Sequence, residues 1–132
     1  MAHPQMFDDD DPLLEQVRAI ALALPGALEK VSHGRPAFFT TRVHCYYGGS
    51  VRIEGEWHAH DQAVMLHLPP AETAALGQDP RCFVPAYLGA SGWIGLDLDE
   101  RTDSQELAEL VEESYRTVAP KRLVARLDDA AR

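Results

Sequence analysis

Cysteine is scarce in this sequence, and the long apolar runs of membrane proteins are missing. The 132 residues include two cysteines, Cys45 and Cys82, too few for a disulfide framework, so we expect both to be buried thiols. No stretch approaches the roughly 18 to 20 apolar residues that a membrane-spanning helix needs. The first residues also lack the basic and apolar regions of a signal peptide. These absences predict a cytoplasmic protein that does not bind a membrane.

Motifs for nucleotide binding and covalent catalysis are also missing. The sequence has neither a Gly-x-x-x-x-Gly-Lys phosphate loop nor a Gly-x-Gly-x-x-Gly turn. Ser91 lacks the Gly-x-Ser-x-Gly spacing of a nucleophile elbow. Ser32 precedes His33, but neighbouring residues of a strand face opposite sides, so this pair is not expected to share a proton. We therefore expect no cofactor, and we favour a binding protein over an enzyme.

His58, His60 and Asp61 form the most metal-like cluster. Alternate residues of an extended strand point the same way, so both imidazoles could face one ion. A site needs three or four placed ligands, and Cys45, His44 or His67 would have to supply the others. Because the segment is polar and exposed histidines are common in loops, we predict no metal.

The overall composition is that of one globular domain. Apolar residues make up 45% of the chain and charged residues 25%, which is ordinary for a folded protein. The length lies within the usual range for a single core. We predict one domain over residues 10–132, preceded by a loose tail at residues 1–9.

Capping and turn residues divide this domain into elements. Asp11-Pro12 is a typical helix start, and Pro25-Gly26 ends the apolar repeat that follows it. Asp103 and Glu106 resemble a capping box, and Ala119-Pro120 ends the helix that they begin. The predicted helices span 12–24, 70–76, 103–118 and a short segment from Pro120; the predicted strands span 29–32, 37–40, 43–47, 51–54, 63–68, 82–87 and 92–98.

The order of these elements indicates the fold class. Strands 37–40 and 43–47 are predicted to form an antiparallel pair, Gly48-Gly49 a turn or bulge, and the residues through Asp61 a polar loop. The order lacks the regular strand-helix alternation of a parallel sheet. We predict an α+β fold, a two-layer sandwich in which helices pack on one face of an antiparallel β-sheet.

Charge is unevenly distributed along the chain. The net charge is −9, yet residues 12–127 carry 11 basic and 15 acidic side chains. Residues 30–53 and 114–127 contain no acidic residue. The first segment holds Lys30, Arg35, Arg42 and Arg52, and the second holds Arg116, Lys121, Arg122 and Arg126. Such segments could form a local face that attracts anions, or their cations could pair with acidic helix faces.

The turn Ser32-His33-Gly34-Arg35-Pro36 has a restricted backbone. Gly34 permits positive φ, and Pro36 biases Arg35 toward an extended conformation. Arg35 is therefore either an anion or partner contact, or an internal ion pair of a structural turn. Trp93 and Tyr115 also have two interpretations. Their rings could form the walls of a pocket, or they could be part of the core.

Four segments, in matching order, resemble the MmcQ/YjbR family of small bacterial proteins. They are Leu22-Ala-Leu-Pro-Gly26, Val31-Ser-His-Gly-Arg-Pro-Ala-Phe38, Phe83-Val-Pro-Ala-Tyr-Leu-Gly89 with Gly92-Trp-Ile-Gly95, and Ser114-Tyr-Arg-Thr-Val-Ala-Pro-Lys-Arg122. The resemblance implies the two-layer fold and a cytoplasmic bacterial protein. Members carry a DNA-binding label because their fold has been likened to a "double-wing" motif, which is an analogy from fold.

The resemblance nominates site residues. It implies polar contacts by His33, Arg35, Lys121 and Arg122, with Phe38, Trp93 and Tyr115 as neighbours. Residues 51–62 match no family segment.

Two functional hypotheses follow. The first is weak binding of DNA or another polyanion through the two acid-free segments, Arg42 included. The alternative is a binding module for a small ligand or a protein, with a pocket lined by His33, Arg35, Phe38, Trp93 and Tyr115. The oligomeric state is not predicted.

Overall fold

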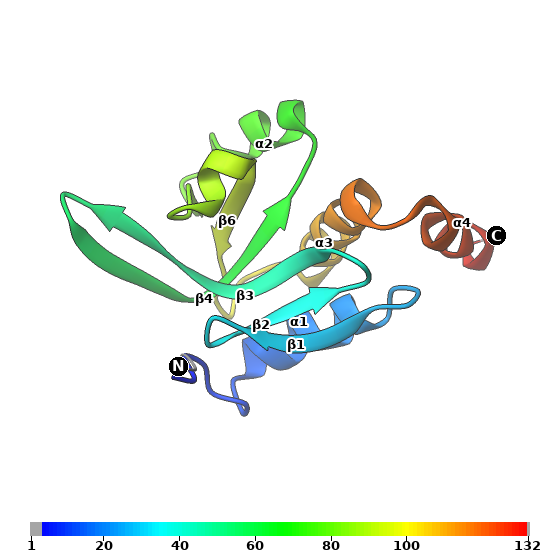
Figure 1. The fold of residues 1–132 in the computed structure, drawn as a ribbon, viewed down its shortest axis with the longest axis horizontal. Helices are drawn as coiled ribbons and strands as arrows, with labels where there is room; N and C mark the ends of the chain where they lie inside the picture. The colour runs from blue at the N-terminus through cyan, green and yellow to red at the C-terminus, as the bar shows by residue number, and fades with distance from the viewer. Residues whose placement is uncertain (1–3, 132) are drawn as a thin grey trace.

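The computed structural model describes residues 4–131 and shows one layer of strands with helices behind it (Figure 1). Six strands form a single antiparallel sheet in the order β1-β2-β3-β4-β6-β5. The predicted α+β class is confirmed. The elements are α1 (Pro12–Leu22), β1 (Leu28–Ser32), β2 (Arg35–Phe39), β3 (Val43–Ile53), β4 (Glu56–His67), α2 (Pro70–Leu76), β5 (Cys82–Phe83), the 3-10 helix η1 (Leu88–Ser91), β6 (Trp93–Asp97), α3 (Ser104–Val118) and α4 (Lys121–Ala130).

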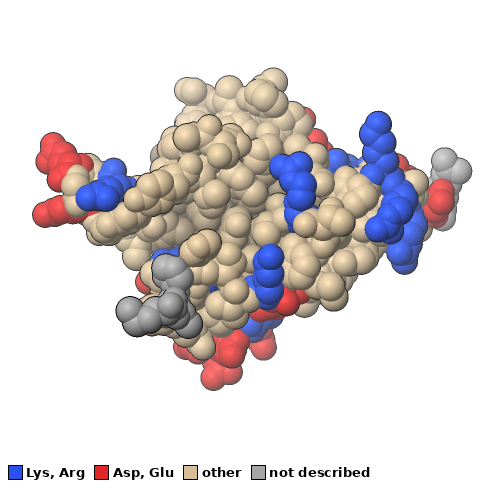
Figure 2. Space-filling view, in the orientation of Figure 1, with Lys and Arg blue, Asp and Glu red and all other residues tan. Residues whose placement is uncertain are grey.

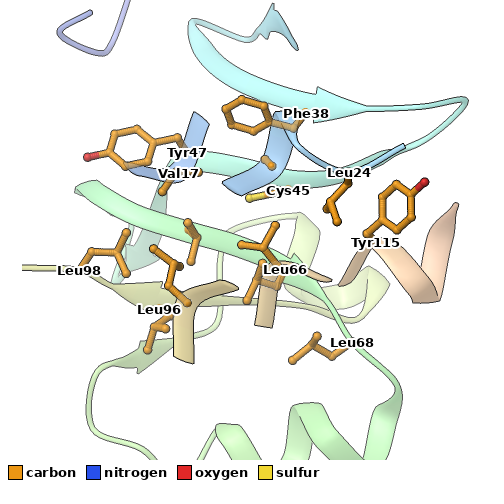
Figure 3. Close-up of a cluster of buried hydrophobic side chains, with 14 of the residues drawn as sticks. Val17, Leu24, Phe38, Cys45, Tyr47, Leu66, Leu68, Leu96, Leu98 and Tyr115 are labelled. Carbon is orange, nitrogen blue, oxygen red and sulfur yellow. The ribbon is translucent and has the colours of Figure 1, made fainter. Parts of the chain in front are cut away.

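Helices α1 and α3 cover one face of the sheet, as predicted. Their N-caps form as expected, because the Asp11 carboxylate accepts from the Leu13 amide and the Asp103 carboxylate from the amides of Gln105 and Glu106. The core lies between these helices and the central strands (Figure 3). Within residues 4–131, no helix has both the length and the apolar character to cross a membrane.

The β3–β4 hairpin confirms the bulge alternative at Gly48-Gly49 and corrects the polar loop predicted through Asp61. β3 passes through Gly48-Gly49 without turning, since positive φ at Gly48 and a register shift there accommodate a bulge. The predicted polar loop is instead the first half of β4. Glu54 and Gly55, both with positive φ, make the tight turn, and the resulting ribbon projects from the body of the domain (Figure 1).

One other prediction differs from the structure. The strand expected over 82–87 ends at Phe83, since the chain leaves β6 at Val84 and turns through Pro85. The loose tail expected at residues 1–9 lies partly outside the described residues, but the Met6 amide donates to the Gly34 carbonyl at 2.8 Å. This bond attaches Met6 to the β1–β2 turn, and the boundary between tail and domain stays a prediction.

A β-bulge between β2 and β3 turns His44 into the core. Phe38 pairs with Cys45 and Phe39 with Val43, which leaves His44 as the extra residue. A bulge re-aims a side chain, and the His44 ring meets the Tyr115 ring edge-on at 5.2 Å between centroids. His44 is fully buried, and neither ring nitrogen has a hydrogen-bond partner among the described residues. Burial lowers the pKa of His44 to about 4.

Ser114 of α3 extends the ladder between β3 and β4. Its buried hydroxyl donates to the His44 carbonyl and accepts from the His67 amide, the latter at 2.8 Å. His44 and His67 stand next to the paired residues Cys45 and Leu66. The hydroxyl therefore satisfies one backbone group on each strand and fastens the helix to both.

Replacing Ser114 by alanine is expected to destabilise the fold by about 2 to 4 kcal/mol, because two buried backbone groups lose their partner. Urea denaturation would measure the change in the free energy of unfolding. Thr117→Ala is the matched control, since the Thr117 hydroxyl is exposed and bonds only to the Glu113 carbonyl of its own helix. Equal effects of the two substitutions would contradict the bridging role of Ser114.

His44 is expected to make the fold sensitive to acid. Its pKa is about 6.5 when unfolded and about 4 when folded, so the unfolded state binds the proton more tightly. Stability from this residue is fully present above pH 6.5 and is lost as the pH falls toward 4, at up to about 1.4 kcal/mol per pH unit. His44→Leu should flatten the pH dependence of urea denaturation between pH 7 and 4.5. His58→Gln, a change at an exposed histidine, should not; parallel curves for wild type and His44→Leu would refute the assignment.

Candidate nucleic-acid interface

The face of the sheet opposite α1 and α3 carries a second set of side chains. Strand pairing places Tyr46 beside Met65 and Met65 beside Gly95. Each of them is next in sequence to a core residue, so it faces the opposite side of the sheet. Phe83 lies over Gly95, where an added Cβ would collide with its ring. We call this surface, which Figure 2 shows in the orientation of Figure 1, the open face.

Aromatic rings line the middle of the open face. The rings of Tyr46 and Trp93 meet edge to face at 5.2 Å between centroids, and His67 and Trp93 do so at 5.3 Å. His67 Nε2 lies 3.0 Å from the Ser91 carbonyl, which ties η1 to β4. Tyr46 and Trp93 are half-buried, so this row is partly accessible.

The projecting ribbon carries a second aromatic group. The Trp57 ring lies 5.8 Å from that of Tyr87 at 41°, and the Arg52 guanidinium lies 5.3 Å from the Trp57 centroid. The Ala86 amide donates to the Ser50 carbonyl at 2.9 Å, so the loop of Tyr87 is attached to β3. Trp57 is 51% exposed and Tyr87 78%. No pattern in the sequence indicated this group.

Several cations form no ion pair, and two of them, Lys30 and Arg52, lie against aromatic rings. Among the described residues, ion pairs engage Arg18, Arg35, Arg81 and Arg116. The other described Lys and Arg side chains form no ion pair; they are Lys30, Arg42, Arg52, Arg101, Lys121, Arg122 and Arg126. The Lys30 ammonium lies 4.7 Å from the centre of the Phe39 ring. In Figure 2 the centre of the view is almost free of acidic side chains, and Lys and Arg gather over α4.

Of the two interpretations of Arg35, the structure shows the internal ion pair and not the exposed contact. Its side chain is 8% exposed and forms an ion pair with Asp61 at 3.1 Å. It also lies against Gly48, where an added Cβ would collide with the guanidinium. The turn thus uses Arg35 to join β2 to the two strands of the hairpin.

The five residues of the predicted pocket are not brought together. Phe38 and Tyr115 are fully buried in the core, where the Tyr115 hydroxyl donates to the Pro25 carbonyl at 2.6 Å. Burial raises the pKa of Tyr115. Trp93 lies on the open face instead, and Arg35 is paired with Asp61. A pocket walled by all five therefore does not form.

His33 is placed by an unusual backbone conformation. Its φ of +52° takes it out of the strand geometry, so Ser32 Oγ lies 3.2 Å from His33 Nδ1. The expectation that these two side chains point apart is wrong for that reason. The Ser32 hydroxyl also hydrogen-bonds to Tyr46. Both His33 and the predicted contacts Arg42, Lys121 and Arg122 are exposed.

The partner and neighbour of His60 on β4 are a carboxylate and an aromatic ring. His60 Nδ1 lies 2.8 Å from Asp97, and its ring stacks on Phe83 at 3.9 Å. Within residues 4–131, no group of three or more His, Cys, Asp or Glu side chains could hold a metal. Both cysteines are free thiols; burial raises the pKa of Cys45, and that of Cys82 to about 11.

A separate groove lies between α2 and α3. Its floor is apolar, and its volume is about 270 Å³. Burial and the neighbouring carboxylate of Glu72 raise the pKa of Glu113 on its rim. The groove is lined by Leu68, Glu72, Leu76, Glu106, Glu109, Leu110 and Glu113.

Comparison with known proteins places the chain in a family. The YjbR family model matches residues 22–117. A search of the curated proteins found no match. Among solved structures, the crystal structure of Deinococcus radiodurans protein DR2400, with the domain DUF419, has a TM-score of 0.58 and 18% identity, covering 82% of this chain and 79% of that one. This likeness shows a shared fold. Since the family model spans well over half of the sequence, the protein belongs to the YjbR family.

Proposed function

We propose that this domain binds nucleic acid through the open face. The observation that carries the proposal is the set of exposed cations without acidic partners beside a surface of aromatic rings. Phosphate contacts need accessible Lys and Arg side chains, and those engaged in ion pairs contribute less. Lys30, Arg42 and Arg52 belong to or adjoin β1, β2 and β3, and Lys30 lies against Phe39 on the open face.

Two clusters of acidic residues lie outside the middle of this surface. Asp8, Asp9, Asp10 and Asp11 surround the start of α1, and Asp9 pairs with Arg18. Four glutamates line the groove between α2 and α3. Because the potential near a surface follows the local arrangement of charge, the open face can attract a polyanion although the whole protein is negative.

Helix α4 supplies a second basic surface. Lys121, Arg122 and Arg126 are exposed, whereas Leu123 is buried and packs against Gly26. Arg116 of α3 is excluded from this set, because it pairs with Glu112 and Asp128. Three accessible cations on a single short helix suit contacts to successive phosphates.

Labelled DNA should bind with an affinity that falls steeply between about 50 and 200 mM salt, as fluorescence anisotropy would show. An Arg42→Ala, Lys121→Ala, Arg122→Ala variant should bind at least tenfold more weakly. It should also lower the slope of log K against log salt by about 2 to 3, because each substitution removes one cation that neutralises a phosphate. Arg101→Ala is the matched control, an exposed unpaired cation at the β6–α3 connection. No binding by the wild type, or an equal weakening in the control, would refute the proposal.

A second candidate function is docking of a basic amphipathic helix of a partner protein. The groove between α2 and α3 favours it, because Leu68, Leu76 and Leu110 offer an apolar floor within a glutamate rim. Glu72 and Glu113 face each other as like charges, which a Lys or Arg side chain would relieve.

A helical peptide of alternating leucine and lysine faces is expected to shift the amide NMR signals of α2 and α3 in a saturable manner. Glu109→Gln with Glu113→Gln should weaken this binding about tenfold. Glu54→Gln with Glu56→Gln removes the same charge at the hairpin turn and serves as the control. Signal changes spread over the whole surface, or equal weakening in both double variants, would show nonspecific attraction only.

A further inference from the structure

Tyr87 is one of three non-glycine residues with positive φ among those described. Its φ of 64° and ψ of −54° are those of a γ-turn with positive φ, and the Leu88 amide donates to the Ala86 carbonyl at 2.7 Å across it. This turn is rare and strained for any residue with a side chain. Glycine would adopt it at less cost.

The surrounding loop holds this conformation in place. The Ala86 amide is bonded to Ser50 of β3, and the Gly89 amide donates to the Pro85 carbonyl at 2.9 Å. Pro85 is buried. The backbone is therefore fixed on both sides of Tyr87, and with it the direction of the Cα–Cβ bond.

Packing of the Tyr87 ring does not offset the strain. The residue is 78% exposed, and its ring contact is with Trp57, itself 51% exposed. Strained residues that persist without a gain in packing are typical of binding sites.

The opposite strand of the ribbon completes the surface. Arg52 and Trp57 form a cross-strand pair, so their side chains share one side of the ribbon. The next pair, Ile53 and Glu56, faces the other side. The aromatic surface thus carries a cation beside it, while the Glu56 carboxylate points away from it.

We propose that Trp57 and Tyr87 form a stacking platform for the unpaired bases of single-stranded nucleic acid, with Arg52 at the adjoining phosphate. This inference rests on the proposed function and narrows its ligand to single strands. Base stacking on aromatic rings next to cations is a general mode of single-strand recognition, and bases in a duplex are not accessible to such rings. The two rings are tilted and not stacked on each other, and the Arg52 guanidinium lies over one face of Trp57, so bases would stack on the ring faces that remain exposed.

The deciding experiment compares fluorescence anisotropy of a labelled 15-residue oligothymidylate, the matching duplex and inorganic polyphosphate at about 50 mM salt. The wild type should bind the single strand most tightly. Tyr87→Gly and Trp57→Ala should each weaken single-strand binding about tenfold, which is typical of the loss of one stacked base. Neither should change polyphosphate binding more than twofold.

Thermal unfolding of the same variants separates a binding role from a structural one. Because glycine relieves the γ-turn, Tyr87→Gly should have a melting temperature equal to or above that of the wild type while it loses single-strand affinity. Ile53→Ala is the matched control, since it removes an exposed apolar side chain from the other side of the ribbon and should leave binding unchanged.

The outcomes distinguish the two proposals. Equal binding of single strand, duplex and polyphosphate, unaffected by Tyr87→Gly, would overturn the platform and leave the proposed polyanion binding intact. A clear fall in melting temperature for Tyr87→Gly would make Tyr87 structural and also overturn the platform. Binding of none of the three probes by the wild type would overturn both.

Discussion

The hydroxyl of Ser114 is the constraint on which the arrangement of this domain depends. It satisfies the His44 carbonyl and the His67 amide at the point where the β3–β4 ladder ends, and it does so from the middle of α3. A helix fastened to two adjacent strands can only lie along that face of the sheet. The bulge at His44 reinforces this choice, because it adds a ring to the same face, against Tyr115. The opposite face is left uncovered by α1 and α3.

The division between the two faces explains where the accessible aromatic and charged side chains lie. Apolar side chains from alternate positions fill the helix side, whereas Tyr46, Trp93 and Phe39 lie opposite. Acidic residues lie at the start of α1, where Asp9 pairs with Arg18, and at the groove between α2 and α3, where Glu106 pairs with Arg81. Arg35 and Arg116 pair with other carboxylates, and the other cations of the described residues form no ion pair. A negatively charged protein can therefore carry a surface suited to polyanions.

Sequence patterns predicted the elements that depend on local chemistry. Asp11 and Asp103 are caps whose effect is confined to the first turn, so both helix starts were confirmed. The β4 part of the ribbon was missed because its first residues are polar or exposed on both sides, as loop residues are. Contacts between distant residues left no local signal either. Trp57 meets Tyr87 thirty positions away, and the choice for Arg35 between an exposed contact and an internal pair depended on Asp61.

The outer part of the ribbon and the core of the domain differ in how far the global stability depends on them. Beyond Tyr46, β3 has no β2 partner, so the outer part of the hairpin is joined to the rest mainly through the Ala86 amide and the contact of Tyr87 with Trp57. Such a segment can open locally without unfolding the core. Residues 51–57 are thus free to change with little effect on global stability. Substitutions there would leave the sheet and the Ser114 bridge, and with them the fold, in place.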